Sequence, residues 1–219
     1  MPHTEIIHHY KRKDFQTAFA FLVLFFIVQV IGLSIQESYE FVSQMIPFSL
    51  LIILGILQGF HKEWDLNYLL SAAGIFLIVF LVFSFSTQTS KLFGPIFFER
   101  SLGWKIWDTP AIIGVFWFLP IYCIFGTLEF FRISDLEKSF LGAVLLTSFD
   151  IFMEPVAYKA EMWRWTEFEA PPQNYLAWLA LAFIIFRTLH YFKVNIHNPL
   201  AMPVFILLFA SVLILNFIL

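Results

Sequence analysis

Two carboxylates four residues apart are the first side chains in this sequence whose types and spacing can do chemistry. Asp150 and Glu154 lie in the apolar run 148–155, SFDIFMEP, and share one face of a helix if the helix continues that far. A carboxylate at the centre of a membrane helix costs on the order of 2.5–3.5 kcal/mol, so such acids mark functional sites by default. Paired carboxylates are typical of general acid–base catalysis, in which one gives a proton and the other takes one. The alternative is structural: Asp150 pairs with a cation from another helix, and Glu154 faces water at the helix end.

The composition places the elements that carry these acids in a membrane. Of 219 residues, 60% are hydrophobic and 13% are charged, and 30 are Phe and 7 are Trp. Soluble domains carry about 25% charged residues, and disordered chains are poor in aromatic residues, so both classes are excluded. The 13 Lys and Arg against 16 Asp and Glu give a net charge of −3, so no broad basic surface is expected for nucleic acid. We predict one integral membrane domain over residues 1–219, an all-α helical bundle in contact with the lipid bilayer.

Seven apolar stretches are long enough to cross the bilayer. A span takes roughly 20 apolar residues in a helix, because irregular backbone facing lipid leaves its polar groups unpaired. We expect Pro155 to disrupt the fifth span directly after the acid pair. The predicted spans are Phe15–Leu33, Phe41–Gly59, Leu66–Phe85, Pro110–Leu128, Ser139–Met153, Asn174–His190 and Pro199–Leu219.

The basic residues favour a cytoplasmic amino terminus. With seven spans, eight Lys and Arg fall on the side of the amino terminus and five on the other, which fits the excess of positive charge on the inner side of membranes. Residues 1–14 are then a cytoplasmic tail, and the longer connections 86–109 and 154–173 both lie on the outer side. We expect the bacterial inner membrane as the location.

Three motifs follow one another in the second half of the chain. They are 150–157 (DIFMEPVA), 162–165 (MWRW) and 171–178 (PPQNYLAW). This order, an Asp with an acid-Pro-Val step, a Trp-x-Trp and a Pro-x-x-Asn-x-x-x-Trp, resembles a family of membrane carotenoid biosynthesis proteins. An upstream block from Phe93 to Trp117 is similar to the family's aromatic loop and following helix, but Ile96, Phe97 and Phe98 stand where the pattern has Tyr or polar residues. The resemblance covers roughly residues 93–192.

The resemblance implies a long-chain carotenoid substrate. The family includes hydratases that act on the acyclic ends of bacterial carotenoids and the bisanhydrobacterioruberin hydratases. Hydration of a terminal double bond needs an acid to protonate the less substituted carbon, and water then captures the tertiary carbocation. Neither a metal nor another cofactor is required. Asp150 or Glu154 would supply the proton, and the other acid would orient or deprotonate the water.

Four Trp and one Asn are the candidate substrate contacts. Aromatic faces stabilise a desolvated cation by about 2 kcal/mol or more, so Trp117, Trp163 and Trp165 are candidate walls. Asn174 offers an amide that can hold water, and it is also a residue type that favours the N-cap of a helix. Trp178 lies four residues later on the same helical face, either as a substrate contact or as a core residue.

Three other functions compete with hydration. A retinal protein needs a Lys in its last helix for the Schiff base, and Pro199–Leu219 contains none. A transporter also uses intramembrane acids, but it more often shows paired broken helices or repeats. A carotenoid cyclase would form the same cation and close a ring on it. The sequence leaves open hydration against cyclisation, which carotenoid is bound, which carboxylate donates and the oligomeric state.

Overall fold

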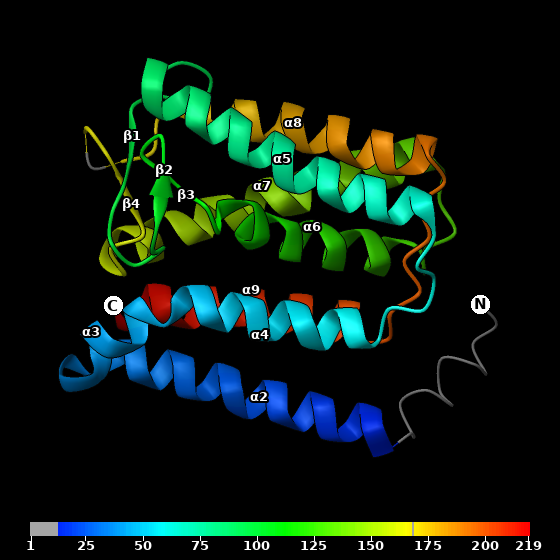
Figure 1. Cartoon of the computed structure of the whole chain (residues 1–219), viewed down its shortest axis with the longest axis horizontal. Coiled ribbons are helices and arrows are strands. Elements are labelled where there is room, and N and C mark those ends of the chain that lie inside the picture. Colours follow the sequence, from blue (N-terminus) through cyan, green and yellow to red (C-terminus); the bar gives the residue numbers. More distant parts are fainter. Residues whose placement is uncertain (1–12, 168) are drawn as a thin grey trace.

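The computed structural model describes residues 13–167 and 169–219, and within them the chain is a bundle of helices with two short β-ribbons (Figure 1). Most of the predicted tail, residues 1–12, lies outside the described part. The elements are α2 (Lys13–Ser34), α3 (Gln36–Gln44), α4 (Ile46–Gly59), α5 (Leu66–Thr89), β1 (Ile96–Phe98), β2 (Lys105–Ile106), β3 (Thr109–Pro110), α6 (Ile113–Leu128), α7 (Asp135–Lys159), β4 (Trp163–Trp165), α8 (Pro172–Tyr191) and α9 (Ala201–Ile218).

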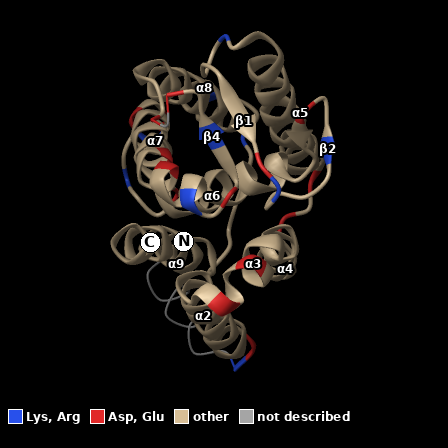
Figure 2. Ribbon diagram, turned by 90° about the vertical axis from the view of Figure 1, so that its left-hand side faces the viewer, with Lys and Arg blue, Asp and Glu red and all other residues tan. Residues whose placement is uncertain are grey.

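Helix α6 forms the centre of the bundle. It is apolar on all sides, as expected for a helix surrounded by protein, and all its residues except Val115 and Thr127 are buried. It contacts α4, α5, α7 and α9. Seen end-on, α5, α6, α7 and α8 form one group, and α2, α3, α4 and α9 form the other, while Lys, Arg, Asp and Glu gather near the ribbons and α3 (Figure 2).

The helices fit an integral membrane protein. Among the described residues, four helices are long and apolar enough to cross a bilayer: α2, α5, α7 and α9. The pair α3 and α4 adds a fifth if it counts as one bent span, and α6 is a shorter apolar helix. Each of the seven predicted spans overlaps a helix, but this test supports four or five crossings, so the count of seven stays a prediction.

The predicted span Phe41–Gly59 is not a single straight helix. Helix α3 ends at Gln44, α4 begins at Ile46, and the two are bent by 60°. Pro47 lies in the first turn of α4, where a residue without an N–H leaves no intrahelical hydrogen bond unmade. The proline therefore favours a new helix start within an apolar run that hydropathy alone reads as continuous.

The expectation that Pro155 ends the acid-bearing helix is wrong, because α7 continues to Lys159. A proline removes one backbone hydrogen bond, and membrane helices tolerate this where neighbouring elements pack against them. Val156 and Ala157 are buried, so the last turn of α7 is packed against the rest of the bundle. The acid pair consequently lies inside a helix of 25 residues.

The two long connections pair with each other. Strand β1 runs antiparallel to β4, with Ile96 opposite Trp165 and Phe98 opposite Trp163. This pairing brings both connections to one end of the bundle, and their place on the outer side of the membrane stays a prediction. Hydropathy gave no sign of the ribbon. The second ribbon, β2 with β3, is a hairpin within the first connection.

Candidate active site

The acid pair on α7 is bridged by an amide from α8. The Asn174 side chain donates from Nδ2 to Asp150 Oδ2 at 2.7 Å and approaches Glu154 Oε1 at 3.4 Å. Asp150 and Asn174 are each only 1% exposed, and Glu154 is half-buried. The two acids therefore share one face of α7, as the four-residue spacing predicts, and that face meets the start of α8.

A glycine lets α7 and α8 approach closely enough for this contact. A Cβ at Gly142 would lie 2.9 Å from Cδ2 of Phe186, well inside normal contact distance. Because glycine has no Cβ, the Phe186 ring packs directly against the α7 backbone. Further toward the end of α7, the same helix pair brings Asn174, at the start of α8, against the two acids.

Asn174 is not the N-cap of α8, so that alternative is wrong. The helix begins at Pro172, with Pro171 in the capping position, and Asn174 is the third helical residue. Proline suits the first helical position because its φ is already helical and its missing N–H would be unpaired there in any case. The two prolines start the helix without help from Asn174, whose amide is directed to the acids.

Strand β4 supplies two further donors to Glu154. Trp165 Nε1 donates to Oε2 at 2.6 Å, and Trp163 Nε1 donates to the same oxygen at 3.1 Å. Residues two apart on a strand point to one face, so Arg164 points away from the site and pairs with Glu99 at 2.9 Å. The strand therefore aims both indole N–H groups at one carboxylate.

The five residues Asp150, Glu154, Asn174, Trp163 and Trp165 are called the acid cluster below. Within the described part of the chain, neither acid forms an ion pair with Lys, Arg or His. The structural alternative, in which Asp150 pairs with a cation, is not what these residues do. Both acids instead accept hydrogen bonds from neutral N–H donors.

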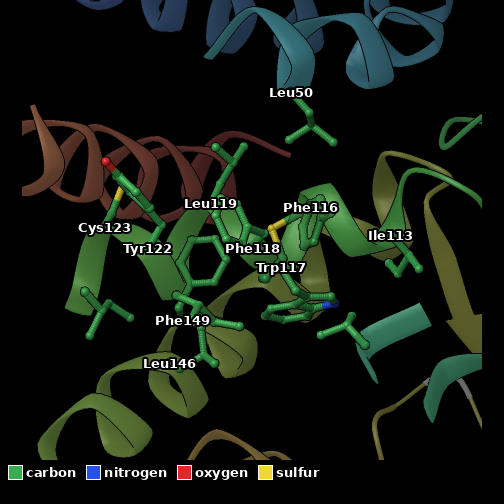
Figure 3. Packing of buried hydrophobic residues seen from close by; sticks show 14 of the residues in the cluster. Leu50, Ile113, Phe116, Trp117, Phe118, Leu119, Tyr122, Cys123, Leu146 and Phe149 are labelled. Atoms are coloured by element: carbon green, nitrogen blue, oxygen red, sulfur yellow. The ribbon is translucent and has the colours of Figure 1, made fainter. Parts of the chain in front are cut away.

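Trp117 and Trp178 form an aromatic wall beside the acid cluster. Their ring centroids are 4.1 Å apart, and Trp117 also lies 6.4 Å from Trp163 and 6.2 Å from Phe149. Trp117 projects from α6 among the buried residues of the core (Figure 3). All seven residues singled out in the sequence thus lie in one region, five joined by hydrogen bonds and two by ring contacts.

The comparison with protein families confirms the resemblance that the motifs indicate. A family model described as "Carotenoid biosynthesis protein" matches residues 41–219. The chain belongs to the carotenoid biosynthesis protein family. The match extends beyond residues 93–192, where the motifs resemble the family, and includes α4 and α5. Neither the curated proteins nor the solved structures gave a match.

This member of the carotenoid biosynthesis family has an apolar groove between α5 and α8. The groove has a volume of about 390 Å³, and Ile75, Ile185 and Leu189 are its buried residues. It reaches Leu181, less than one helical turn from Trp178. The sequence gives no direct signal for this groove, because residues that line a groove in lipid have the same apolar types as residues that face lipid.

A second buried polar cluster lies where α4, α6 and the start of α9 meet. Tyr122 Oη accepts from Asn198 Nδ2 at 2.8 Å and lies 2.9 Å from His61 Nδ1, while the Asn198 amide also donates to Leu57 O at 2.7 Å. His61 is stacked on the Tyr68 ring at 3.8 Å. His61, Tyr122 and Asn198 are called the far cluster below. Sequence reasoning missed it because His61 and Asn198 flank two predicted spans while Tyr122 lies inside a third, and no spacing links them.

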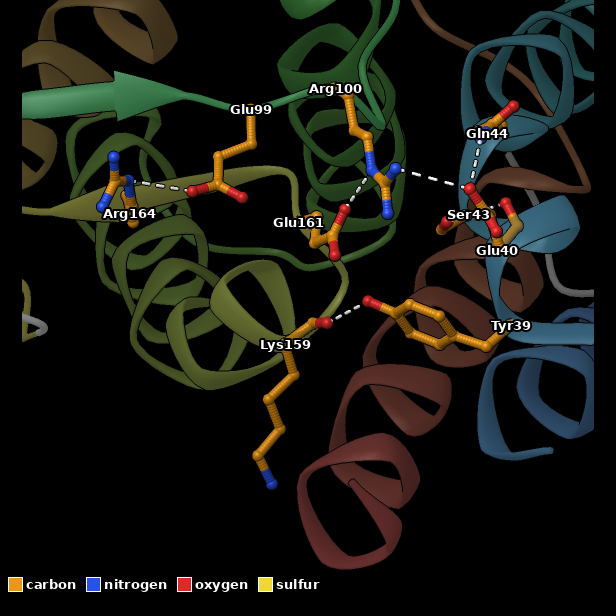
Figure 4. A network of polar contacts seen from close by, with 9 residues as sticks. All are labelled: Tyr39, Glu40, Ser43, Gln44, Glu99, Arg100, Lys159, Glu161 and Arg164. Carbon is orange, nitrogen blue, oxygen red and sulfur yellow. Dashed lines mark hydrogen bonds and ion pairs between the residues drawn. The ribbon is translucent and has the colours of Figure 1, made fainter. Parts of the chain in front are cut away.

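A surface network ties the ribbon end to α3 (Figure 4). Arg100 follows β1, bonds Glu161 and contacts Glu40 of α3 at 3.4 Å. Tyr39 of α3 donates to the main-chain carbonyl of Lys159 at the end of α7. These contacts join the two groups of helices close to the acid cluster.

Within the described residues, no group of three or more His, Cys, Asp or Glu side chains could hold a metal ion. Cys123 is buried in α6 and carries no disulfide.

Proposed function

We propose that this protein is a carotenoid hydratase that adds water to the terminal double bond of an acyclic carotenoid end. The observation that carries the proposal is the acid cluster: two carboxylates in an apolar helix that accept hydrogen bonds from the Asn174 amide and two indole N–H groups, next to the packed rings of Trp117 and Trp178. This arrangement joins a proton donor, a proton acceptor and a cation-stabilising wall in a site surrounded by hydrocarbon.

The hydrogen bonds divide the roles of the two acids. Glu154 accepts from Trp163 and Trp165 and lies within reach of Asn174, and such a set of donors fits an ionised carboxylate, which is an acceptor only. Asp150 has one donor and is the more buried acid. We assign Asp150 as the general acid and Glu154 as the general base.

The reaction then follows in two steps. Asp150 gives its proton to the less substituted alkene carbon, and the electron pair of the double bond forms the new C–H bond, leaving a tertiary cation. Water adds to the cation through an oxygen lone pair, and Glu154 takes the proton that the water loses. Return of that proton from Glu154 to Asp150 restores the starting state, and the net change is the addition of one water.

The aromatic wall stabilises the cation between these steps. The wall residues Trp117 and Trp178, together with the neighbouring Trp163, offer π-faces in a desolvated site. A cation–π contact there contributes about 2 kcal/mol or more. Among the described residues, the side chains of Lys138 and Arg164 pair with Glu129 and Glu99 and not with the two acids of the site.

The groove between α5 and α8 supplies a path for the hydrocarbon chain. The residues that line the groove extend over about three turns of each helix, so the groove is roughly 16 Å long at 1.5 Å per residue. Its end at Leu181 is close to Trp178, whose ring contacts Phe83 and Phe93 on the side of α5. A polyene lying in this groove would direct its end toward the aromatic wall.

The location that fits this function is the bacterial inner membrane with a cytoplasmic amino terminus. Eight basic residues against five support that orientation. The ribbon end and the acid cluster would then lie toward the outer side.

Co-expression with a host that makes an acyclic-ended carotenoid tests the proposal. Mass spectrometry of the pigment should show a gain of one water per end modified. An isomer of unchanged mass would instead support a cyclase, and unchanged pigment from well-expressed protein would contradict both. Solute or proton flux in proteoliposomes would favour a transporter.

A further inference from the structure

Trp117 carries a buried indole N–H that has no acceptor among the described residues. Its side chain is 1% exposed, and Nε1 lies within hydrogen-bond distance of no acceptor in that part of the chain. Two other indoles of the site, those of Trp163 and Trp165, both donate to Glu154. A buried donor without a partner destabilises a fold by about 1–3 kcal/mol, and a Phe at this position would avoid the penalty. The N–H therefore calls for an acceptor that residues 13–167 and 169–219 do not provide.

The ring that carries this N–H is packed against residues of the proposed site. The Trp117 ring packs against Trp178 with the ring centroids 4.1 Å apart, and it also contacts Trp163, whose N–H donates to Glu154. On its other side it meets Phe149, the neighbour of Asp150 in α7, at 6.2 Å. In Figure 3 the indole nitrogen lies on the edge of the ring turned away from Phe149. The Trp163 ring thus links Trp117 to Glu154, and Phe149 links Trp117 to the turn of α7 that carries Asp150.

We propose that the Trp117 N–H binds the oxygen of the water molecule that captures the carbocation. This inference rests on the proposed hydratase function and names the group that positions its second substrate. One lone pair of the water accepts from Nε1, the other lone pair forms the new C–O bond, and a hydrogen of the water remains available for Glu154 to remove. The π-face of an indole stabilises the cation without any contribution from the N–H. The Trp117 N–H therefore has a separate role, which is to hold water in an otherwise apolar site.

The role predicts that protonation and water capture can be separated. A cation that meets no water loses a proton and returns to an alkene, so in D₂O the carotenoid takes up deuterium without gaining oxygen. Replacement of the N–H should reduce hydration and leave this exchange in place. Loss of the proton donor Asp150 should stop both, because no cation then forms.

The test uses two replacements at position 117 in membrane vesicles, with the acyclic carotenoid that the wild-type protein hydrates as the probe. Trp117→Phe removes the donor and shortens the ring. Incorporation of β-(3-benzothienyl)alanine at position 117 replaces N–H by sulfur and keeps the shape of the indole. The same replacement at Trp64, whose N–H donates to His61 O at 3.2 Å far from the acids, is the control for the incorporation.

We expect the benzothienyl protein to form hydrated product about tenfold more slowly, because one hydrogen bond is lost. Deuterium uptake into unreacted carotenoid should stay within about twofold of wild type, and the Trp64 control should hydrate normally. Hydration at the wild-type rate would overturn the inference, and so would an equal fall in hydration and deuterium uptake. If the wild-type protein hydrates no carotenoid but isomerises it, the proposed function fails instead, and this result is distinct from the others.

Discussion

The acid cluster and the far cluster are both buried and polar, yet they differ in the types of group that their hydrogen bonds hold. In the acid cluster, two carboxylates meet neutral N–H donors from α8 and β4. In the far cluster, Tyr122 lies between the Asn198 amide and the His61 ring, and the Asn198 Oδ1 accepts from the Leu200 backbone. The first cluster contains two carboxyl groups, which can gain and lose protons while their N–H partners stay in place, and the second contains no carboxyl group.

We propose that the acid cluster serves the reaction and that the far cluster serves stability. Polar groups buried in a bundle must be paired, and the far cluster does this while it joins α4, α6 and the start of α9. A pair of acids in an apolar helix destabilises the fold relative to neutral residues, so its retention calls for a function. Substitutions in the two clusters should therefore change different quantities.

Asp150→Asn should have the largest effect and break the acid cluster as a catalyst. The amide oxygen can still accept from Asn174, but the side chain has no acidic proton, so hydration should fall by about 10²–10⁴-fold. The measurement is product per folded protein after co-expression. Asp135→Asn, at the exposed start of the same helix, is the matched control and should retain activity. Full activity of the Asp150 variant would reject the role of this acid.

Glu154→Gln should reduce hydration by a smaller factor, about tenfold to a hundredfold, on the scale of general base catalysis. Water attacks a carbocation readily, so removing its proton is an easier step than protonating the alkene. The amide oxygen of Gln can still accept from Trp163 and Trp165, which keeps β4 in place. A larger loss than that of Asp150→Asn would reverse the assignment of acid and base.

Tyr122→Phe should lower stability and leave the chemistry intact. It removes the partner of Asn198 and of His61, and a buried group left without its partner lowers the free energy of unfolding by about 1–3 kcal/mol. Denaturation in detergent measures the loss, and product per folded protein should match wild type. A specific loss of activity at full stability would place the far cluster in the reaction.

The far cluster should also make stability depend weakly on pH. Burial lowers the pKa of His61, which lies in the connection between α4 and α5, so the folded state favours the neutral ring. Stability from this group is present above the unfolded pKa of about 6.5 and declines as the pH falls through it. The melting temperature in detergent should fall between pH 7.5 and 5.5, and His61→Gln should reduce the slope. An unchanged slope would remove His61 as its source.

The sequence predicted the parts of the acid cluster that depend on local spacing. A four-residue interval places Asp150 and Glu154 on one helical face in any register, and the motif order selected Trp163, Trp165 and Asn174. Which group contacts which acid depends on the approach of α8 and on strand pairing across the ribbon, and neither leaves a periodic signal. The N-cap expectation for Asn174 failed because the two preceding prolines start the helix themselves.

Helix boundaries show the same limit. Hydropathy located the apolar segments, but the bend between α3 and α4 and the last turn of α7 depend on how two prolines are packed. Pro47 begins a helix where it replaces no hydrogen bond, and Pro155 is tolerated where Val156 and Ala157 are buried. The same residue type therefore breaks one predicted span and leaves another intact.

The bridge from Asn174 to the acids has a consequence for biosynthesis. The ribosome makes Asp150 and Glu154 before it makes their amide partner, which follows 24 and 20 residues later. Until α8 arrives, α7 carries two acids that Asn174 does not yet bridge, each opposing insertion by on the order of 2.5–3.5 kcal/mol if it reaches the bilayer centre. Helix α7 should thus enter the membrane together with α8 as a hairpin, and a nascent chain stopped before residue 172 should insert α7 less completely than one that extends through Tyr191.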